Sequence, residues 1–203
     1  MTAAIWTLTY EIAPDNRARY LDWFHDIHIP EKLSRAGYRW AGHYQSTDSD
    51  RYVAFFGGDS TRVFFDPSPA QLKQSQDDLT REMIALRQNP SSYVFTEEWD
   101  CVGPDIEDRP GAAIELLTGA AEEDDAFNAW LAQEMMQVFC NSEGAIRARK
   151  LLATLGPAKH GVLYQFSDSQ ALGAFNSALP PSPNFKPENG ARFTGHRLWP
   201  PVP

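Results

Sequence analysis

The sequence has few of the features that mark a nucleic-acid binder or a membrane protein. It contains 18 Lys and Arg against 27 Asp and Glu, a net charge of −9, and no basic run longer than Arg149-Lys150. Nucleic-acid binding requires clustered positive charge to neutralise phosphates, so we expect no nucleic-acid partner. No stretch approaches the roughly 20 consecutive apolar residues that cross a bilayer, so we expect no membrane partner.

Cysteine and targeting signals are scarce as well. The two cysteines, Cys101 and Cys140, can form at most one disulfide and cannot make a four-cysteine zinc site. Residues 1–9 lack the basic start and the small-residue cleavage site of a signal peptide. We therefore expect a chain that starts here, a cytoplasmic location and reduced cysteines.

Motifs for nucleotide binding and covalent catalysis are missing too. The glycine-containing segment 57–67 lacks the Gly-x-x-x-x-Gly-Lys spacing of a phosphate loop, and no Gly-x-Gly-x-x-Gly occurs. There is no Gly-x-Ser-x-Gly elbow, and neither cysteine has a histidine nearby in sequence. Acid/base chemistry without a cofactor is the enzyme chemistry that remains.

Aromatic residues, in contrast, are plentiful. The chain has 6 Trp, 7 Tyr and 12 Phe, which make up 12% of its residues. These wide side chains can fill a core and also line an apolar pocket for a small molecule.

Hydrophobic periodicity predicts a β-α-β-β-α-β order in the first half. The predicted elements are a strand at 4–12, a helix from 15, strands at 38–45 and 51–56, a helix at 69–88 and a strand at 92–101. Because Pro30 lacks an amide hydrogen, we expect the first helix to end or kink near residues 28–29, with a short further turn closed by Gly37. This order defines a ferredoxin-like unit.

The pattern starts again after a Pro/Gly-rich linker at 103–111. Residues 113–118 echo residues 4–9, and Trp130 stands in the following helix where Trp23 stood. The later predicted elements are strands at 145–155 and 160–166, a helix at 169–179, a proline-rich loop and a strand at 191–199. We expect two ferredoxin-like units, 1–103 and 111–203, with chance similarity of short α/β segments as the alternative.

One segment resembles a known superfamily. Its sequence is Trp23-Phe24-His25-Asp26-Ile27-His28-Ile29-Pro30-Glu31. It is similar to the His-x-Pro segment of EthD-like members of the dimeric α/β barrel superfamily and to the Trp…His-Ile-Pro-acid segment of bacterial chalcone isomerases. The resemblance implies an α+β fold in which two units pack sheet against sheet as a barrel, here from one chain, with each pocket between sheet and helices.

The resemblance also implies an acid or base role for His28. Histidine suits this role because its ordinary pKa of about 6.5 leaves both forms accessible. The alternative is that His28 only binds a loop carbonyl and fixes the kink. In the second half, Met135 and Ala132 stand where His28 and His25 stand, so we expect one site per chain, in the first half.

We expect neither a metal nor haem. His25 shares a helical face with His28 and lies beside Asp22 and Asp26, but no third ligand cluster appears. Chlorite dismutase-like relatives bind haem through a histidine in their second half. The only histidines there are His160 and His196, which fall in predicted strands.

Two alternatives remain for the predicted strand at 38–45, which follows the first helix. Trp40 and Tyr44 share one face, and His43 lies on the other. Either the aromatic face walls a pocket near His28, or it meets the barrel interior. His43 is either a second polar group in the site or a barrel-interior residue, and the alternation along the strand does not decide between them. The predicted catalytic residues are His28, His25 and His43. The predicted substrate-contacting residues are Trp6, Tyr20, Trp23, Trp40, Tyr44 and, as a lid, Phe65.

The leading hypothesis is a cofactor-independent lyase or isomerase that acts on a small hydrophobic or aromatic molecule by histidine acid/base catalysis. The alternatives are a non-catalytic binder of an apolar molecule and a cofactor-free monooxygenase of the same superfamily. A homodimer is compatible with the sequence, because duplication can replace dimerisation or precede it.

Overall fold

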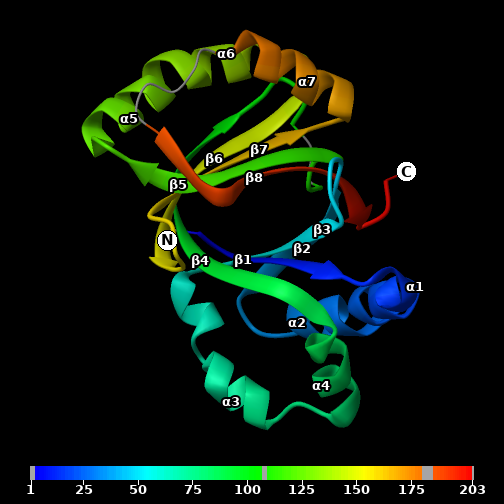
Figure 1. Ribbon diagram of the computed structural model, residues 1–203. Helices are drawn as coiled ribbons and strands as arrows, with labels where there is room; N and C mark the ends of the chain where they lie inside the picture. Colours follow the sequence, from blue (N-terminus) through cyan, green and yellow to red (C-terminus); the bar gives the residue numbers. More distant parts are fainter. Residues whose placement is uncertain (1–2, 107–108, 180–184, 203) are drawn as a thin grey trace.

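The fold is an α+β barrel. The computed structural model describes residues 3–106, 109–179 and 185–202. Their strands close into one antiparallel barrel in the order β1-β3-β2-β8-β5-β7-β6-β4 (Figure 1). The strands are β1 (Ala4–Ile12), β2 (Tyr38–Ser46), β3 (Arg51–Gly58), β4 (Arg87–Val102), β5 (Ala113–Ala121), β6 (Ala145–Leu155), β7 (His160–Phe166) and β8 (Phe185–Trp199).

Helices cover the barrel on two opposite sides (Figure 1). Those beside β1–β4 are α1 (Pro14–Trp23), the π turn η1 (Phe24–His28), α2 (Ile29–Leu33), the 3-10 turn η2 (Thr61–Phe64), α3 (Pro69–Gln74) and α4 (Asp78–Ala85). Those beside β5–β8 are α5 (Asp124–Trp130), the π turn η3 (Leu131–Met135), α6 (Met136–Cys140) and α7 (Ser169–Ala178). No helix of the described segments is long and apolar enough to cross a membrane.

Strand alternation divides the interior into three apolar layers. On β1, Leu8 and Tyr10 point to the helices, whereas Ile5 points into the barrel. Each helical layer forms a core with its own half of the sheet. The barrel interior draws on both halves, with Phe55 and Phe95 packed in the same cluster as Leu163.

Most predicted strands are confirmed, but the helix at 69–88 is not continuous. The predicted helix is divided into α3 and α4. The Asp77 side chain accepts a hydrogen bond from the amide of Thr80 at the start of α4. Asp77 therefore acts as a new N-cap that restarts the helix. β4 begins at Arg87, earlier than predicted. The proline-rich loop predicted before β8 lies partly outside the described residues.

The first helix does not end at Pro30, but the expected irregularity near residues 28–29 is present: α1 gives way to the π turn η1, which ends at His28, and the short helix α2 follows. The chain widens into η1, where the amide of Ile29 donates to the carbonyl of Phe24, and then continues helically as α2. Pro30 lies at the start of α2, a position where its missing amide costs little. As expected, the helical segment is closed before Gly37, whose φ of 86° is in the left-handed region.

Candidate active site

Two of the three predicted histidines meet between the helices and the sheet. His25 comes from the π turn η1, and His43 from β2, where it points toward the helices and not into the barrel. His25 Nε2 and His43 Nδ1 are 2.8 Å apart. The structure thus decides between the two faces that the sequence left open for His43.

A tyrosine extends this pair into a chain. The hydroxyl of Tyr10, on β1, lies 2.8 Å from His43 Nε2. His43 and Tyr10 are buried, while His25 is half-buried at the outer end. The result is a hydrogen-bonded path from the protein surface into the core, which we call the His25–His43–Tyr10 relay.

Tyr20 and Arg87 surround the inner end of the relay. Arg87 Nε donates to the Tyr20 hydroxyl at 2.7 Å, and its guanidinium lies 5.1 Å from the centre of the Tyr10 ring. Burial, followed by the neighbouring Tyr20, holds the pKa of Tyr10 well above its usual value. Tyr10 therefore keeps its proton at neutral pH.

Burial keeps both relay histidines neutral. It lowers the pKa of His25 and lowers that of His43 well below its ordinary value, because a charged imidazole loses its hydration there. A neutral imidazole donates from one nitrogen and accepts at the other. The relay can therefore point either way, and His25 presents either an N–H or a free lone pair at its outer nitrogen.

His28 lies outside the relay. Its ring packs against Trp23 and Phe24 at centroid distances of 4.6 and 5.3 Å, and only 4% of the residue is exposed. Its Nδ1 has no hydrogen-bond partner. Burial, followed by the nearby cations Lys32, Arg87 and Arg35, holds the pKa of His28 well below its ordinary value. His28 is a neutral side chain with an unused polar atom.

A cavity whose wall carries both charges, with Glu31 and Asp77 beside the basic side chains, adjoins this region. Lys32 is buried at the wall of a cavity of about 140 Å³ between α2 and α4, together with Arg35 and Asp77. Burial, helped by Arg35, lowers the pKa of Lys32 to about 8. An amine with this pKa can change its charge near neutral pH.

The predicted aromatic residues fall into two groups. Tyr20 and Trp23 pack around the relay, and Trp6 belongs to the same layer, where its Nε1 donates to Ser92 Oγ at 2.8 Å. Phe65 lies just after η2, is 37% exposed and is outside this cluster. Its proposed role as a lid remains a prediction.

Trp40 and Tyr44 require a correction. Both belong to the cluster inside the barrel, and the Tyr44 hydroxyl donates to the carbonyl of Gly111 at 2.9 Å. Alternate residues of a strand face opposite sides, so β2 itself separates these rings from His25 and His28. They do not wall a pocket around the histidines.

The second half contains an ionisable cluster of its own. As expected, η3 carries Ala132 and Met135 where η1 carries His25 and His28. On β6, however, the fully buried Lys150 lies 2.9 Å from His160 Nδ1, and His160 Nε2 lies 2.8 Å from Asp124 Oδ1. The helix comparison alone does not reveal this cluster, because its members come from β6, β7 and α5.

The histidines of the second half do not fit an axial haem ligand. Both ring nitrogens of His160 already lie within hydrogen-bond distance of Lys150 and Asp124, and His196 is exposed on β8. Within the described segments, no three His, Cys, Asp or Glu side chains are grouped so that they could hold a metal ion. Cys101 and Cys140 are both free thiols.

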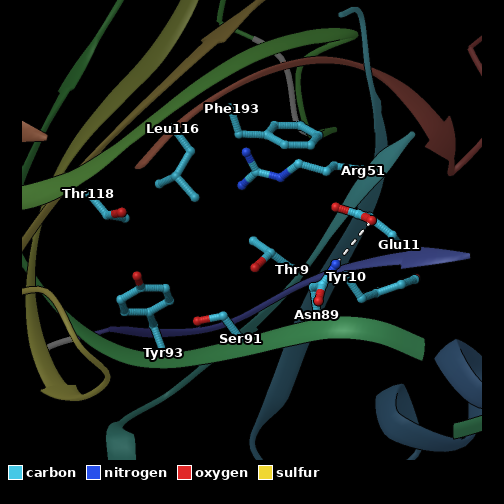
Figure 2. A pocket seen from close by; sticks show the side chains of 10 residues that line it. All are labelled: Thr9, Tyr10, Glu11, Arg51, Asn89, Ser91, Tyr93, Leu116, Thr118 and Phe193. Atoms are coloured by element: carbon cyan, nitrogen blue, oxygen red, sulfur yellow. Dashed lines mark hydrogen bonds between the residues drawn. The ribbon is translucent and has the colours of Figure 1, made fainter. Parts of the chain in front are cut away.

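A further cavity, of about 170 Å³, opens at one end of the barrel (Figure 2). Side chains of Thr9, Ser91 and Tyr93 point into it, and Asn89 donates to Glu11 at 3.2 Å at its rim. None of the predicted site histidines lines this cavity, and of the relay only Tyr10 contributes to its wall.

Comparisons with known proteins agree on the fold. No protein-family model and no curated protein sequence matches the chain. Among solved structures, a proposed monooxygenase from Lactobacillus acidophilus NCFM has a TM-score of 0.65 at 12% identity, covering 97% of this chain and 94% of its own. A proposed chlorite dismutase has a TM-score of 0.65 at 13% identity, covering 98% and 95%.

An anthrone oxidase-like protein is similar over 97% of this chain and 91% of its own, with a TM-score of 0.61 and 12% identity. At these identities the likeness concerns the fold alone. The chain therefore has an eight-stranded α+β barrel fold like that of the monooxygenase-like and chlorite dismutase-like proteins.

Proposed function

We propose that the protein is an enzyme that moves a proton on a small hydrophobic or aromatic molecule. The observation that carries this proposal is the His25–His43–Tyr10 relay, with its two contacts of 2.8 Å. A buried polar chain that reaches the surface offers a path for a proton, which the binding of an apolar ligand does not require. Such chains are costly to bury and must be fully hydrogen-bonded.

In this proposal His25 is the base that touches the substrate. It accepts the substrate proton at its outer nitrogen, Nδ1, and shares the resulting positive charge with His43 through the Nε2–Nδ1 contact. Tyr10 holds the far end of the relay. Because both rings are neutral beforehand, the base is ready without prior loss of a proton.

The surroundings of the relay favour an aromatic substrate that becomes anionic. Trp23 and Phe24 supply apolar surface next to His28. Removal of a proton from a carbonyl-bearing or phenolic compound leaves negative charge on oxygen. The nearby cations, Lys32 and Arg87, would stabilise that charge.

Proton removal serves two reaction classes. Return of the proton at another position gives an isomerase or lyase, as the EthD-like resemblance implies. Reaction of the deprotonated substrate with oxygen gives a cofactor-free monooxygenase, and the structurally similar proteins described as a monooxygenase and as anthrone oxidase-like support that alternative. Oxygen consumption during turnover separates the two.

We also propose that the chain consists of two ferredoxin-like units, 1–103 and 111–203, of which the first is active. The two halves share a π turn at the same place in their first helix, η1 and η3. They also share a positive-φ glycine before their second strand, Gly37 and Gly144. His43 and Lys150 follow these glycines at the same distance along the chain.

The proposal is tested by proton exchange, which does not require the natural substrate. Anthrone and 2′-hydroxychalcone are incubated in D₂O with the wild type, and exchange or ring closure is followed by NMR with and without oxygen. We expect acceleration by the wild type and a loss of at least about 100-fold in His25→Gln, the contribution typical of a positioned base.

His196→Gln is the matched control, because His196 is exposed on β8. This variant should retain the wild-type rate. His28→Gln distinguishes the two histidines: a comparable loss in His28→Gln together with a wild-type rate in His25→Gln would return the role of base to His28. Saturable binding of both probes without any exchange in the wild type would contradict an enzyme and favour a carrier.

A further inference from the structure

Two lysines of the described segments are buried, and they differ in their partners. The amine of Lys150 contacts Glu98, the carbonyl of Leu151 and His160 Nδ1. Lys32 is 5% exposed, yet within the described segments its amine makes no hydrogen bond and no ion pair. Burial of a charge without a partner is strongly unfavourable, so burial favours the uncharged amine. Lys32 thus carries a buried amine that no neighbouring side chain engages.

The carboxylates that line the same cavity as Lys32 are engaged elsewhere. Glu31 Oε1 accepts from Arg35 Nη2 at 2.6 Å. Asp77 Oδ1 accepts from the amide of Thr80 at 2.7 Å, where it caps α4. Neither carboxylate lies within ion-pair distance of the Lys32 amine. The cavity wall therefore carries both charges, but it gives Lys32 no counter-ion of its own.

The charged groups that face Lys32 favour its uncharged form. Burial, followed by the charge of Arg35, lowers the pKa of Lys32 to about 8. Arg87, on β4, acts in the same direction, Glu31 opposes it, and His28, on η1, is neutral. At pH 7.5 about a quarter of amines with this pKa are uncharged, against about 0.1% of lysines with the ordinary pKa of 10.5. The uncharged amine is the form that attacks a carbonyl carbon.

The cavity between α2 and α4 gives a small molecule access to this amine. Nζ of Lys32 is not one of the fully enclosed atoms that lack a partner, so the little surface that the residue exposes includes its nitrogen. The volume is about 140 Å³, and a cavity of about 150 Å³ is enough for a molecule of the size of benzene. The occupant is therefore a small molecule.

The wall of the cavity selects a polar occupant. Leu72 is the one apolar side chain among the described residues that line it, and Ser75, Gln76 and Thr80 supply hydroxyl and amide groups. A hydroxylated molecule can form hydrogen bonds with such a wall, whereas an apolar one of the same size cannot. An aldehyde that also carries a hydroxyl group matches both the amine and the wall.

We propose that Lys32 is the carbonyl-binding residue of this cavity and that its amine forms a reversible imine with a small hydroxylated aldehyde. The nitrogen lone pair attacks the carbonyl carbon, and the carbonyl oxygen takes up the proton that nitrogen gives up, which yields a carbinolamine. Loss of the new hydroxyl group with the remaining proton on nitrogen releases water and leaves the C=N bond. The step needs neither an oxidant nor a reductant.

This site is separate from the His25–His43–Tyr10 relay. None of the three relay residues lines the cavity. At neutral pH most of Lys32 is still charged, as its proposed effect on the substrate oxygen requires. His25→Gln should therefore leave the reaction of Lys32 with an aldehyde unchanged, and failure of either proposal leaves the other standing.

The test measures reductive labelling of the full-length wild type at pH 7.5. Glycolaldehyde is added with sodium cyanoborohydride, which reduces the imine to a stable secondary amine, and peptide mass spectrometry quantifies each lysine. Lys73, on α3, is the matched control, because it is exposed. We expect labelling of Lys32 at least tenfold faster than that of Lys73, with a rate that saturates as glycolaldehyde increases. Equal or slower labelling of Lys32 would overturn the proposal.

Two further aldehydes test the size and the polarity of the cavity, with labelling of Lys73 as the internal reference. 2-Naphthaldehyde has two fused rings and is too large to enter, so the ratio of Lys32 to Lys73 labelling should fall below 1. Propionaldehyde matches glycolaldehyde in size but lacks its hydroxyl group, and the ratio should be at least threefold lower than with glycolaldehyde. A ratio that is the same for all three aldehydes would mean that the cavity does not bind the aldehyde.

One substitution tests how the amine is activated. Arg35→Gln removes a cation near Lys32 and releases the carboxylate of Glu31, and both changes raise the pKa of Lys32. Labelling of Lys32 at pH 7.5 should fall at least threefold in Arg35→Gln. Arg19→Gln, which removes an exposed arginine paired with Glu82, should label as the wild type does. Labelling of Lys32 at the wild-type rate in Arg35→Gln would contradict this activation.

Discussion

The hydroxyl of Tyr10 is expected to contribute to stability as well as to the relay. Tyr10→Phe would leave the buried Nε2 of His43 without its partner at 2.8 Å. An unsatisfied buried polar atom costs about 1–3 kcal/mol. Urea unfolding of Tyr10→Phe should therefore show a free energy of unfolding lower than that of the wild type by about this amount.

Tyr52 provides the matched control. Its ring stacks on that of Tyr10 at 5.8 Å, but its own hydroxyl is buried without a hydrogen-bond partner. Tyr52→Phe removes an unpaired polar atom and leaves none behind, so its stability should equal or exceed that of the wild type. A similar loss in both variants would mean that the relay adds nothing beyond ring packing.

The buried histidines make stability depend on pH in a defined direction. The pKa values of His28 and His43 in the folded protein lie well below the value of about 6.5 expected in the unfolded chain. Below pH 6.5 the unfolded chain thus binds protons that the folded protein does not. The free energy of unfolding should be unaffected by these groups above pH 6.5 and should fall as the pH decreases below it.

The size of this effect can be measured by substitution. Each such histidine contributes a slope of up to about 1.4 kcal/mol per pH unit. His28→Gln should reduce the slope between pH 6.5 and pH 5 by up to that amount, while His196→Gln, on the exposed side of β8, should not. Equal slopes in wild type and His28→Gln would show that His28 is not buried in neutral form.

The sequence predicted His25 and His43 as site residues but could not predict that His43 contacts both His25 and Tyr10. Alternation along β1 and β2 assigns faces, yet it does not say which face meets the helices. β3 lies between β1 and β2 in the barrel, so Tyr10 and His43 are on strands that are not neighbours. The place of Arg87 beside the relay was not predicted either, for a different reason. The predicted helix at 69–88 included this residue.

At the scale of elements, the glycines are of two kinds. Two lie in turns that need a positive φ, whereas a third lies in a helix that does not. Gly37 and Gly144 have φ of 86° and 75°, and a Cβ would lie 2.6 Å from Val63 Cγ2 and 2.5 Å from Ala171 Cβ, respectively. Gly173, in α7, has no atom within 4 Å of a Cβ position. Gly173→Ala should stabilise the protein by about 0.5–1 kcal/mol, because glycine is the poorer helix former.

The same substitution at Gly37 or Gly144 should have the opposite sign. Both residues join a helix to the next strand, and alanine there combines an unfavourable backbone angle with a steric clash. Thermal unfolding of the three alanine variants measures the contrast. Destabilisation by Gly173→Ala would indicate that the open face of α7 is covered in solution.

The two π turns show what part Pro30 plays in the irregularity of the first helix. η1 precedes Pro30, whereas η3 at the corresponding place has Met136 and Gln137 after it and no proline. The widened turn is therefore not caused by proline. It lets the helix continue and turns His25 toward β2, a geometry that periodicity cannot reveal because a π turn shifts the hydrogen-bond register by one residue.

At the scale of the whole molecule, hydrophobic periodicity did not predict that the strands close into a barrel. Strand patterns and the linker predicted two similar units, and only the superfamily resemblance implied that they pack together. The structure joins the halves by two strand pairs, β2 with β8 and β4 with β6. These pairs involve residues far apart in the sequence, for which alternation carries no information.

This closure predicts that the two halves unfold together. The cluster inside the barrel has Ile5, Val53 and Phe55 from the first half against Leu116 and Leu163 from the second. Separation of the halves would expose these side chains and free the edges of four strands. Calorimetry of the full chain should show one transition, with a ratio of van't Hoff to calorimetric enthalpy near 1.

Fragments provide the decisive comparison. Residues 1–106 alone keep the helical core of their half but lose the partners of β2 and β4. Sedimentation should therefore show association of this fragment, because a second copy can cover the exposed sheet face and pair with both open edges. Two resolved transitions in the full chain, or a folded monomeric fragment, would show that each half is stable by itself and that the shared interior is not the source of cooperativity.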